Sequence, residues 1–172
     1  MLQFITASDR KLMHKVNQWP APKWVRFSAI VATRAGDGWL WVLAGLLVLF
    51  FGGQDRLPAL ASAGSAALAG IGIFMLTKKF SGRKRPFEIE PHCWAKLLPP
   101  DRFSFPSGHT ITAFAVTISI SQFYPALLPA LLFCALSIAA SRILLGMHFL
   151  SDVLAGAALG TGLAISSHAI FA

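Results

Sequence analysis

Three short polar segments carry the residue types that suit anion chemistry. They are Lys78–Pro86 (KKFSGRKRP), Pro106–His109 (PSGH) and Ser141–Asp152 (SRILLGMHFLSD). The first is dense in Lys and Arg, the second ends in a histidine, and the third combines an arginine, a histidine and an aspartate. Cations, imidazoles and a carboxylate together predict a site that binds a phosphate-like anion and moves protons around it.

The third segment suggests a nucleophile or base. His148 and Asp152 are four residues apart, a spacing that predicts one shared helix face. The Asp152 carboxylate would then accept the imidazole N–H, select the tautomer and stabilise the cation that forms during reaction. Arg142 precedes His148 by six residues and can donate a planar fork to phosphate oxygens. An ionised carboxylate entering an apolar helix is costly without a partner, so we expect Asp152 to be functional.

The other two segments supply further groups for an anion. Ser107 is expected to cap the helix that follows, Gly108 lets a ligand approach the backbone, and free N–H groups at a helix start attract anions. His109 would project beside the anion and can serve as an acid. Lys78 and Arg85 add two more cations for a tetrahedral dianion.

The remaining histidines and the cysteines carry no such pattern. We expect His14, His92 and His168 to be structural or incidental, as single histidines near a membrane interface usually are. Cys93 and Cys134 show neither metal-ligand spacing nor a disulfide framework. The sequence therefore predicts no metal site and no cofactor.

The elements that position these residues are apolar. Hydrophobic residues make up 55% of the 172 residues and charged residues 13%, whereas a soluble domain carries about 25% charged residues. This composition predicts a protein whose solvent is mostly lipid. The net charge of +8 then fits Lys and Arg at the membrane interface and around an anionic substrate, and we expect no nucleic-acid partner.

Hydropathy predicts an all-α, polytopic membrane helix bundle. Its candidate spans are Trp39–Phe51, which is short and must borrow flanking residues, then Leu57–Thr77, Ile111–Ala140 and Phe149–Phe171. Tyr124-Pro125 splits the third into two helices, so about five crossings are expected, with four to six as the range. Gly156 and Gly160 form a small-xxx-small pair that we interpret as helix packing.

The first 35 residues are amphipathic. Phe4–Trp19 and Trp24–Thr33 are too short to cross a bilayer; they are typical of interfacial helices, with a soluble helical cap as the alternative. The N-terminus lacks the apolar core of a signal peptide, so insertion is expected to depend on the internal spans. We expect one domain, residues 1–172, with interfacial helices in 1–35 and a transmembrane core in 36–172.

The three polar segments should meet in space. Each lies at a membrane boundary: after the second span, before the third, and between the fourth and fifth. Because successive spans alternate in direction, all three boundaries fall on the same face of the membrane. This convergence follows from the hydropathy pattern alone.

The combined pattern resembles a known family. Lys, six residues and Arg-Pro, then Pro-Ser-Gly-His, then Ser-Arg, five residues, His, three residues and Asp, is similar to the full signature of the type 2 phosphatidic acid phosphatase superfamily. Every position matches without departure, and the flanking helices resemble those of the membrane lipid phosphatase branch, which includes phosphatidylglycerophosphatase B-like and undecaprenyl pyrophosphate phosphatase-like enzymes.

The resemblance implies a role for each residue. His148 looks like a nucleophile that forms a phosphohistidine, with Asp152 orienting it, and His109 looks like the general acid that protonates the leaving alkoxide. The resemblance further implies a phosphate cradle and a metal-independent reaction. The cradle comprises Lys78, Arg85, Ser107, Gly108 and Arg142.

The sequence therefore predicts a membrane lipid phosphatase, a multi-pass protein of the bacterial inner membrane. Candidate substrates are phosphatidylglycerophosphate, undecaprenyl pyrophosphate, phosphatidic acid and lipid A; the first two are our first expectation. The alternatives are a lipid phosphotransferase of the same superfamily and, less favoured, an anion channel or transporter. A channel should have cations deep in several spans, whereas Arg142 and Asp152 are the only Lys, Arg, Asp or Glu residues after Ile111. Oligomeric state is left open.

The orientation in the membrane is also left open. If the N-terminal helices lie on the active-site face, all but Arg56 of the 15 Lys and Arg residues share that face. The positive-inside rule then predicts that it is cytoplasmic. The membrane branch of the resembled family more often works on the outer face, so the two arguments oppose each other.

Overall fold

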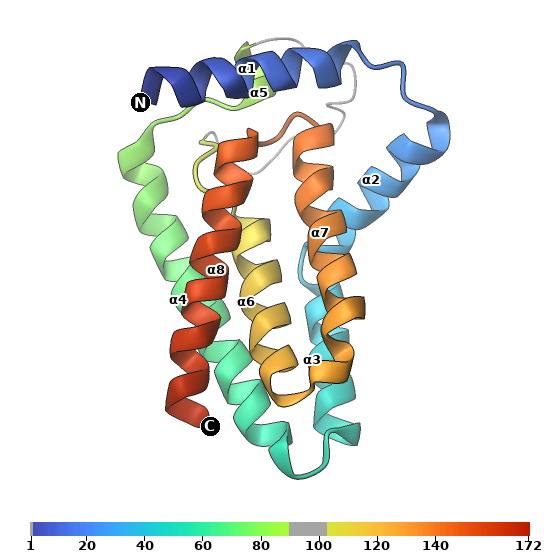
Figure 1. Cartoon of the computed structure of the whole chain (residues 1–172), viewed down its shortest axis with the longest axis vertical. Coiled ribbons are helices and arrows are strands. Elements are labelled where there is room, and N and C mark those ends of the chain that lie inside the picture. Colours follow the sequence, from blue (N-terminus) through green and yellow to red (C-terminus); the bar gives the residue numbers. More distant parts are fainter. Residues whose placement is uncertain (1, 90–102) are drawn as a thin grey trace.

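The structure, a computed structural model, describes residues 2–89 and 103–172, and most of these residues lie in helices (Figure 1). Within these residues no β-strand is formed beyond a single bridge between Lys84 and Phe103. The helices are α1 (Leu2–Gln18), α2 (Lys23–Ala35), α3 (Trp39–Phe51), η1 (Gly53–Asp55), α4 (Arg56–Ser81), α5 (Pro86–Ile89), α6 (Gly108–Phe123), η2 (Pro125–Leu127), α7 (Leu128–Leu144) and α8 (Leu150–Phe171). The predicted all-α fold is confirmed.

Helix α6 is the centre of the bundle. It packs against α4, α7 and α8 and lies between α7 and α8 in Figure 1. Small residues along α6, such as Ala113 and Ala115, are fully buried and allow the neighbouring helices to approach closely. The outer faces of the bundle are apolar and exposed, as at Phe51 and Phe133, which is what contact with lipid requires.

Three segments are long and apolar enough to cross a membrane: Gly53–Lys78, Pro125–Leu144 and Leu150–Phe171. Helices α2 and α3 pass the same test as a pair, bent by 58° between them. With 16 residues, α6 is shorter than a typical span of about 20 residues, so helix length alone does not confirm the predicted number of crossings. The predicted break at Tyr124-Pro125 is confirmed, because α6 ends at Phe123 and η2 begins at Pro125.

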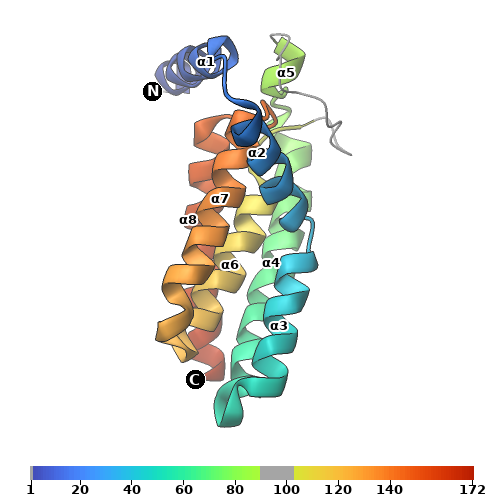
Figure 2. The same cartoon turned by 90° about the vertical axis from the view of Figure 1, so that its right-hand side faces the viewer.

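The two N-terminal helices differ in how they lie. Helix α1 runs across one end of the bundle, roughly perpendicular to its axis (Figures 1 and 2), as expected of an interfacial helix. Helix α2 instead descends obliquely along α7 and leads into α3 through Gly36–Gly38. Together α2 and α3 are long and apolar enough to form one bent span, and Gly38, with φ of +121°, provides the turn between them.

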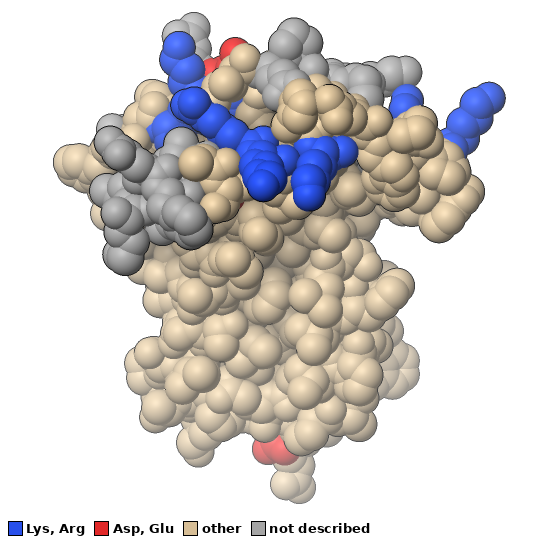
Figure 3. All heavy atoms as spheres, turned by 45° about the horizontal axis from the view of Figure 1, so that its top comes forward, with Lys and Arg blue, Asp and Glu red and all other residues tan. Residues whose placement is uncertain are grey.

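Charge is concentrated at the end that carries α1. In Figure 3 the Lys and Arg side chains gather at this end, and the lower body of the visible face shows none. This end also carries the C-terminus of α4, the N-terminus of α6 and the α7–α8 connection. The chain therefore brings its three polar motifs to one end, as the alternation of spans predicts.

Candidate active site

A cavity of about 370 Å³ lies at this end, beneath the α2–α3 turn. Its lining contains six of the eight predicted site residues: Lys78, Arg85, Gly108, His109, Arg142 and His148. Ser107 and Asp152 are fully buried and are not among the lining residues. Segments distant in sequence thus place two histidines and three cations around one space large enough for a phosphate group.

The three cations are almost completely buried. Lys78, Arg85 and Arg142 are 7%, 1% and 5% exposed. The Lys78 ammonium lies 4.1 Å from the centre of the Phe74 ring, Arg85 donates to the Met147 carbonyl at 2.8 Å, and Arg142 donates to the Thr33 hydroxyl. Cations held this far from water are costly. An anion in the cavity would offset that cost, and this favours a phosphate ligand.

His148 is held in one tautomer. It lies just before α8, 2% exposed, and its Nδ1 is 2.6 Å from the Ser104 carbonyl oxygen. Because a carbonyl can only accept, Nδ1 must carry the proton. The lone pair is then on Nε2, which lies 3.3 Å from Nη1 of Arg85 on a residue that lines the cavity. Burial lowers the pKa of His148 to about 3, so the imidazole is neutral at physiological pH, as a nucleophile must be.

The predicted contact between Asp152 and His148 differs from what the structure shows. Their facing atoms, Asp152 Oδ2 and His148 Nδ1, are 3.7 Å apart, which exceeds a hydrogen bond. Oδ2 accepts the backbone N–H of Phe149 instead. The spacing argument assumed that both residues lie on a helix, whereas His148 precedes the first turn of α8. Asp152 therefore provides a nearby negative charge, and Ser104 makes the hydrogen bond.

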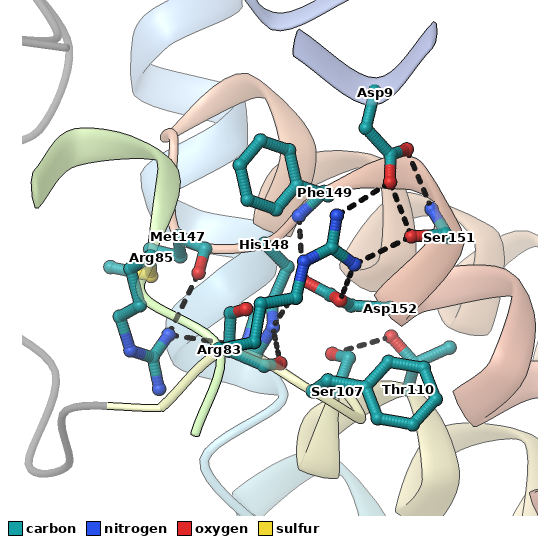
Figure 4. Close-up of polar contacts among 12 residues, drawn as sticks. Asp9, Arg83, Arg85, Ser107, Thr110, Met147, His148, Phe149, Ser151 and Asp152 are labelled. Carbon is teal, nitrogen blue, oxygen red and sulfur yellow. Dashed lines mark hydrogen bonds and ion pairs between the residues drawn. The ribbon is translucent and has the colours of Figure 1, made fainter. Parts of the chain in front are cut away.

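Ser107 also differs from the prediction. It stands at the N-cap position of α6, but its side chain makes no capping hydrogen bond. Its hydroxyl instead accepts a hydrogen bond from Thr110 at 2.9 Å, and its backbone N–H donates to the Asp152 carbonyl oxygen. Ser107 thus connects α6 to α8 through its backbone, while its side chain contacts Thr110 (Figure 4). Its expected contact with phosphate stays a prediction.

His109 has a partner that the sequence analysis missed. Nε2 of His109 lies 2.8 Å from Oδ1 of Asp37, and Asp37 also lines the cavity. Asp37 belongs to the α2–α3 turn, seventy-two positions earlier in the chain. It matches no local motif, and only the Gly-Asp-Gly context of a tight turn sets it apart. Burial and the nearby charge of Arg142 lower the pKa of His109, and the Asp37 carboxylate opposes this by favouring the protonated, acidic form.

Two other functional candidates were missed for the same reason. Arg83 contacts Asp152 and Asp9 at 2.6 and 2.7 Å, and all three appear in Figure 4 around the start of α8. In the sequence Arg83 is one of several flanking cations, and Asp9 is one polar residue of an amphipathic segment. His14 and His168 lie outside the cavity lining, as expected. His92 and Cys93 are outside the described residues.

Comparison with known proteins agrees with this geometry. Residues 58–172 match the model of the PAP2 superfamily. Lipid A 1-phosphatase of Rhizobium johnstonii is 29% identical over 89% of this chain and 70% of its own length. Decaprenylphosphoryl-5-phosphoribose phosphatase of Mycolicibacterium smegmatis is 30% identical, over 77% of this chain and 78% of its own.

A solved structure shows the same arrangement of helices. The crystal structure of LpxE of Aquifex aeolicus superposes with a TM-score of 0.75 at 26% identity, covering 91% of this chain and 92% of LpxE. The matched family region contains all three polar motifs and the helices that carry them. The chain therefore belongs to the PAP2 superfamily.

Proposed function

We propose that this integral membrane protein, a lipid phosphatase, transfers the phosphoryl group of its substrate to Nε2 of His148 before water releases it. One observation carries the proposal. His148, a buried, neutral imidazole with its lone pair on Nε2, lines the same cavity as Lys78, Arg85 and Arg142. Phosphoryl transfer depends mostly on in-line positioning and charge neutralisation, and both are available there.

The two half-reactions can be assigned to named atoms. In the first, the bond from phosphorus to Nε2 of His148 forms as the bond to the lipid oxygen breaks, and His109 gives its proton to that oxygen. In the second, His109 takes a proton from water, water attacks phosphorus, and the P–N bond breaks to release inorganic phosphate. Asp37 supports the acid form of His109, and Asp152 faces the positive charge on the phosphorylated ring.

Metal independence is part of the proposal. Three buried cations around the cavity provide the neutralisation that Mg²⁺ supplies in other phosphoryl-transfer enzymes. We expect the purified protein to release phosphate undiminished in EDTA. Loss of activity that Mg²⁺ or Zn²⁺ restores would contradict this part of the proposal. It would not affect the assignment of His148 as the nucleophile.

The substrate class follows from the setting of the cavity. It lies where apolar α4 meets the charged end of the bundle, with Ile71 and Phe74 among the residues that line it. We infer a phosphomonoester or pyrophosphate of a membrane lipid in a bacterial inner membrane. The relatives are named for lipid A and decaprenylphosphoryl-5-phosphoribose. A panel of those two, phosphatidylglycerophosphate, phosphatidic acid and undecaprenyl pyrophosphate, ranked by kcat/KM, selects among them.

The nucleophile is tested by trapping the intermediate. Protein mixed with ³²P-labelled lipid substrate and quenched in alkaline detergent should carry label that is stable to base and lost in acid, as a P–N bond requires. His148→Ala should carry no label, whereas His109→Ala should accumulate or retain it when a substrate with a good leaving group is used. Equal phosphate release by wild type and His148→Ala would overturn the mechanism.

A further inference from the structure

A cluster of charges with two buried carboxylates lies next to His148, outside the lining of the cavity. It consists of Asp9 on α1, Arg83 after α4, and Ser151 and Asp152 on α8, and we refer to it as the α1 clamp (Figure 4). Nη1 of Arg83 donates to Oδ1 of Asp152 at 2.6 Å and to the Ser151 hydroxyl at 2.7 Å. Nη2 donates to Oδ2 of Asp9 at 2.7 Å. One guanidinium therefore joins two carboxylates from opposite ends of the chain.

The geometry of the clamp is specific to arginine. Asp9 and Asp152 are 5% and 0% exposed, and the guanidinium stacks 4.2 Å from the centre of the Phe149 ring. A planar group with several fixed donors can serve two carboxylates and an aromatic face together, which a lysine ammonium cannot do. Two carboxylates this deeply buried are strongly destabilising without a shared cation.

Asp9 also extends the clamp to the backbone of α8. Its Oδ1 accepts the N–H of Ser151 at 3.1 Å, and its Oδ2 accepts the Ser151 hydroxyl. The Ser151 N–H belongs to the first turn of α8, where free N–H groups favour a carboxylate. Helix α1, which lies across the end of the bundle, is thus attached to the turn that carries Asp152.

The clamp acts on the reaction through Asp152 alone. Neither Arg83 nor Asp9 lines the cavity, so neither is placed to touch the phosphate. Asp152 Oδ2 faces His148 Nδ1 at 3.7 Å, and its other oxygen is held by Arg83. Without Arg83, the Asp152 carboxylate keeps only the Phe149 N–H as a fixed donor among these contacts.

We propose that Arg83 and Asp9 are positioning residues that hold the Asp152 carboxylate against the His148 ring, so that the surface helix α1 is coupled to the nucleophile. The inference rests on the proposed function, because it matters only if the His148 ring becomes positively charged on phosphorylation. The clamp then keeps a negative charge close to that ring. Its loss should slow formation of the phosphoenzyme and leave binding of phosphate in the cavity unchanged.

The first test compares Arg83→Gln with Lys84→Gln, which removes an exposed cation one position away. We expect Arg83→Gln to lower kcat by about ten- to hundredfold, a loss of the size typical when the hydrogen-bond partner behind a metal-ligating residue is removed. KM and inhibition by inorganic phosphate should stay within about twofold of wild type, since both report the cavity. Lys84→Gln should match wild type throughout. Arg83→Gln with the kcat of Lys84→Gln would overturn the inference, as would a change confined to KM.

Two further variants separate positioning from folding. Arg83→Lys keeps the charge without the fork and should recover part of kcat, whereas Asp9→Asn should lower kcat on its own. The double variant Asp9→Asn/Arg83→Gln should be no slower than Arg83→Gln, because both changes disable one unit. If the two substitutions lowered kcat independently, so that their fold losses multiplied in the double variant, a shared clamp would be contradicted. If Arg83→Gln does not fold, Arg83→Lys and Asp9→Asn decide the question by the same kcat and KM measurements.

Failure of this inference can be told from failure of the proposed function. If His148→Ala retains activity, the nucleophile is wrong and the clamp has no reaction to serve. If His148→Ala is inactive and carries no label while Arg83→Gln and Asp9→Asn both keep wild-type kcat, only the proposal for the α1 clamp is wrong. Single-turnover labelling of the same proteins provides both results.

Discussion

At the scale of single residues, the proposed role of His148 as nucleophile depends on its burial. A histidine that attacks phosphorus has to be neutral, and burial lowers the pKa of His148 to about 3 from the usual 6.5. In the unfolded chain the same imidazole takes up a proton as the pH falls below 6.5. Between these two values the unfolded state binds more protons than the native state, so acid lowers the free energy of unfolding.

This difference gives a prediction for stability. Each pH unit below 6.5 should remove about 1.4 kcal/mol of the native protein's stability through His148, or about 2 kcal/mol at pH 5. His148→Asn cannot titrate but can still donate to the Ser104 carbonyl, so it should lose less stability between pH 7.5 and pH 5. Thermal unfolding in detergent at both pH values measures this. Equal losses in the two proteins would mean that the imidazole titrates normally.

Asp37 is the second residue whose chemistry can be tested alone. Asp37→Asn removes the carboxylate beside His109. Without that negative charge the pKa of His109 falls further, so fewer molecules carry the proton that the leaving oxygen needs. We expect kcat to fall by at least about tenfold with a lipid alkoxide leaving group, since general acid catalysis contributes roughly 10²–10⁴. The loss should be much smaller with an aryl phosphate, whose leaving group needs no proton.

The matched control for Asp37 is Asp55→Asn. Asp55 is exposed and lies in η1, at the other end of α3 from Asp37, so its substitution should leave both substrates unaffected. If Asp37→Asn lowers kcat equally for both substrates, the Asp37 carboxylate maintains the fold of the α2–α3 turn and does not act through His109.

At the scale of elements, the site depends on how closely α6 and α8 approach. A Cβ at Gly160 would clash with the Ile111 carbonyl oxygen, and one at Gly156 would lie 2.9 Å from that of Ser107. These contacts involve backbone, which cannot move aside as a side chain can. The small-xxx-small pair therefore sets the distance between α6, which carries His109 in its first turn, and α8, which follows His148.

Gly160→Ala tests this packing, with Gly162→Ala as its control on the same helix. Gly162 has open space where its Cβ would stand. We expect Gly160→Ala to destabilise the protein by about 1–3 kcal/mol, as overpacking usually does, and Gly162→Ala to leave stability unchanged or slightly raised. Thermal unfolding in detergent compares them. Equal behaviour would show that α6 and α8 separate without cost.

At the scale of the whole molecule, the active-site end and the α3–α4 turn lie at opposite ends of the bundle (Figure 1). We expect Lys84→Cys and Gln54→Cys, both exposed positions, to react with an impermeant thiol reagent from opposite sides of the membrane. The background should have Cys93 and Cys134 replaced. The side on which Lys84→Cys reacts assigns the active-site face. Labelling of both positions from one side would contradict a bundle that spans the bilayer.

The sequence alone predicted the helices and six of the residues that line the cavity. Runs such as Leu57–Thr77 can be satisfied in lipid only as helices, and each agrees closely with its counterpart in the structure, here α4 (Arg56–Ser81). Alternating spans place the three motifs at one end before any contact is known. Six of the eight predicted site residues line the cavity, because residues that hold an anion must be of a few chemical types and carry a recognisable spacing.

Tertiary structure decided what those residues touch. Asp37 reaches His109 across seventy-two positions, and Asp9 reaches Arg83 and Ser151 from the first helix; no spacing predicts contacts between separate elements. The Ser104 carbonyl holds His148 where the sequence favoured Asp152, because His148 lies before the helix and not on it. Local sequence sets which groups are present and which element carries them. Which partner each group finds depends on how the elements pack, and that is a property of the whole chain.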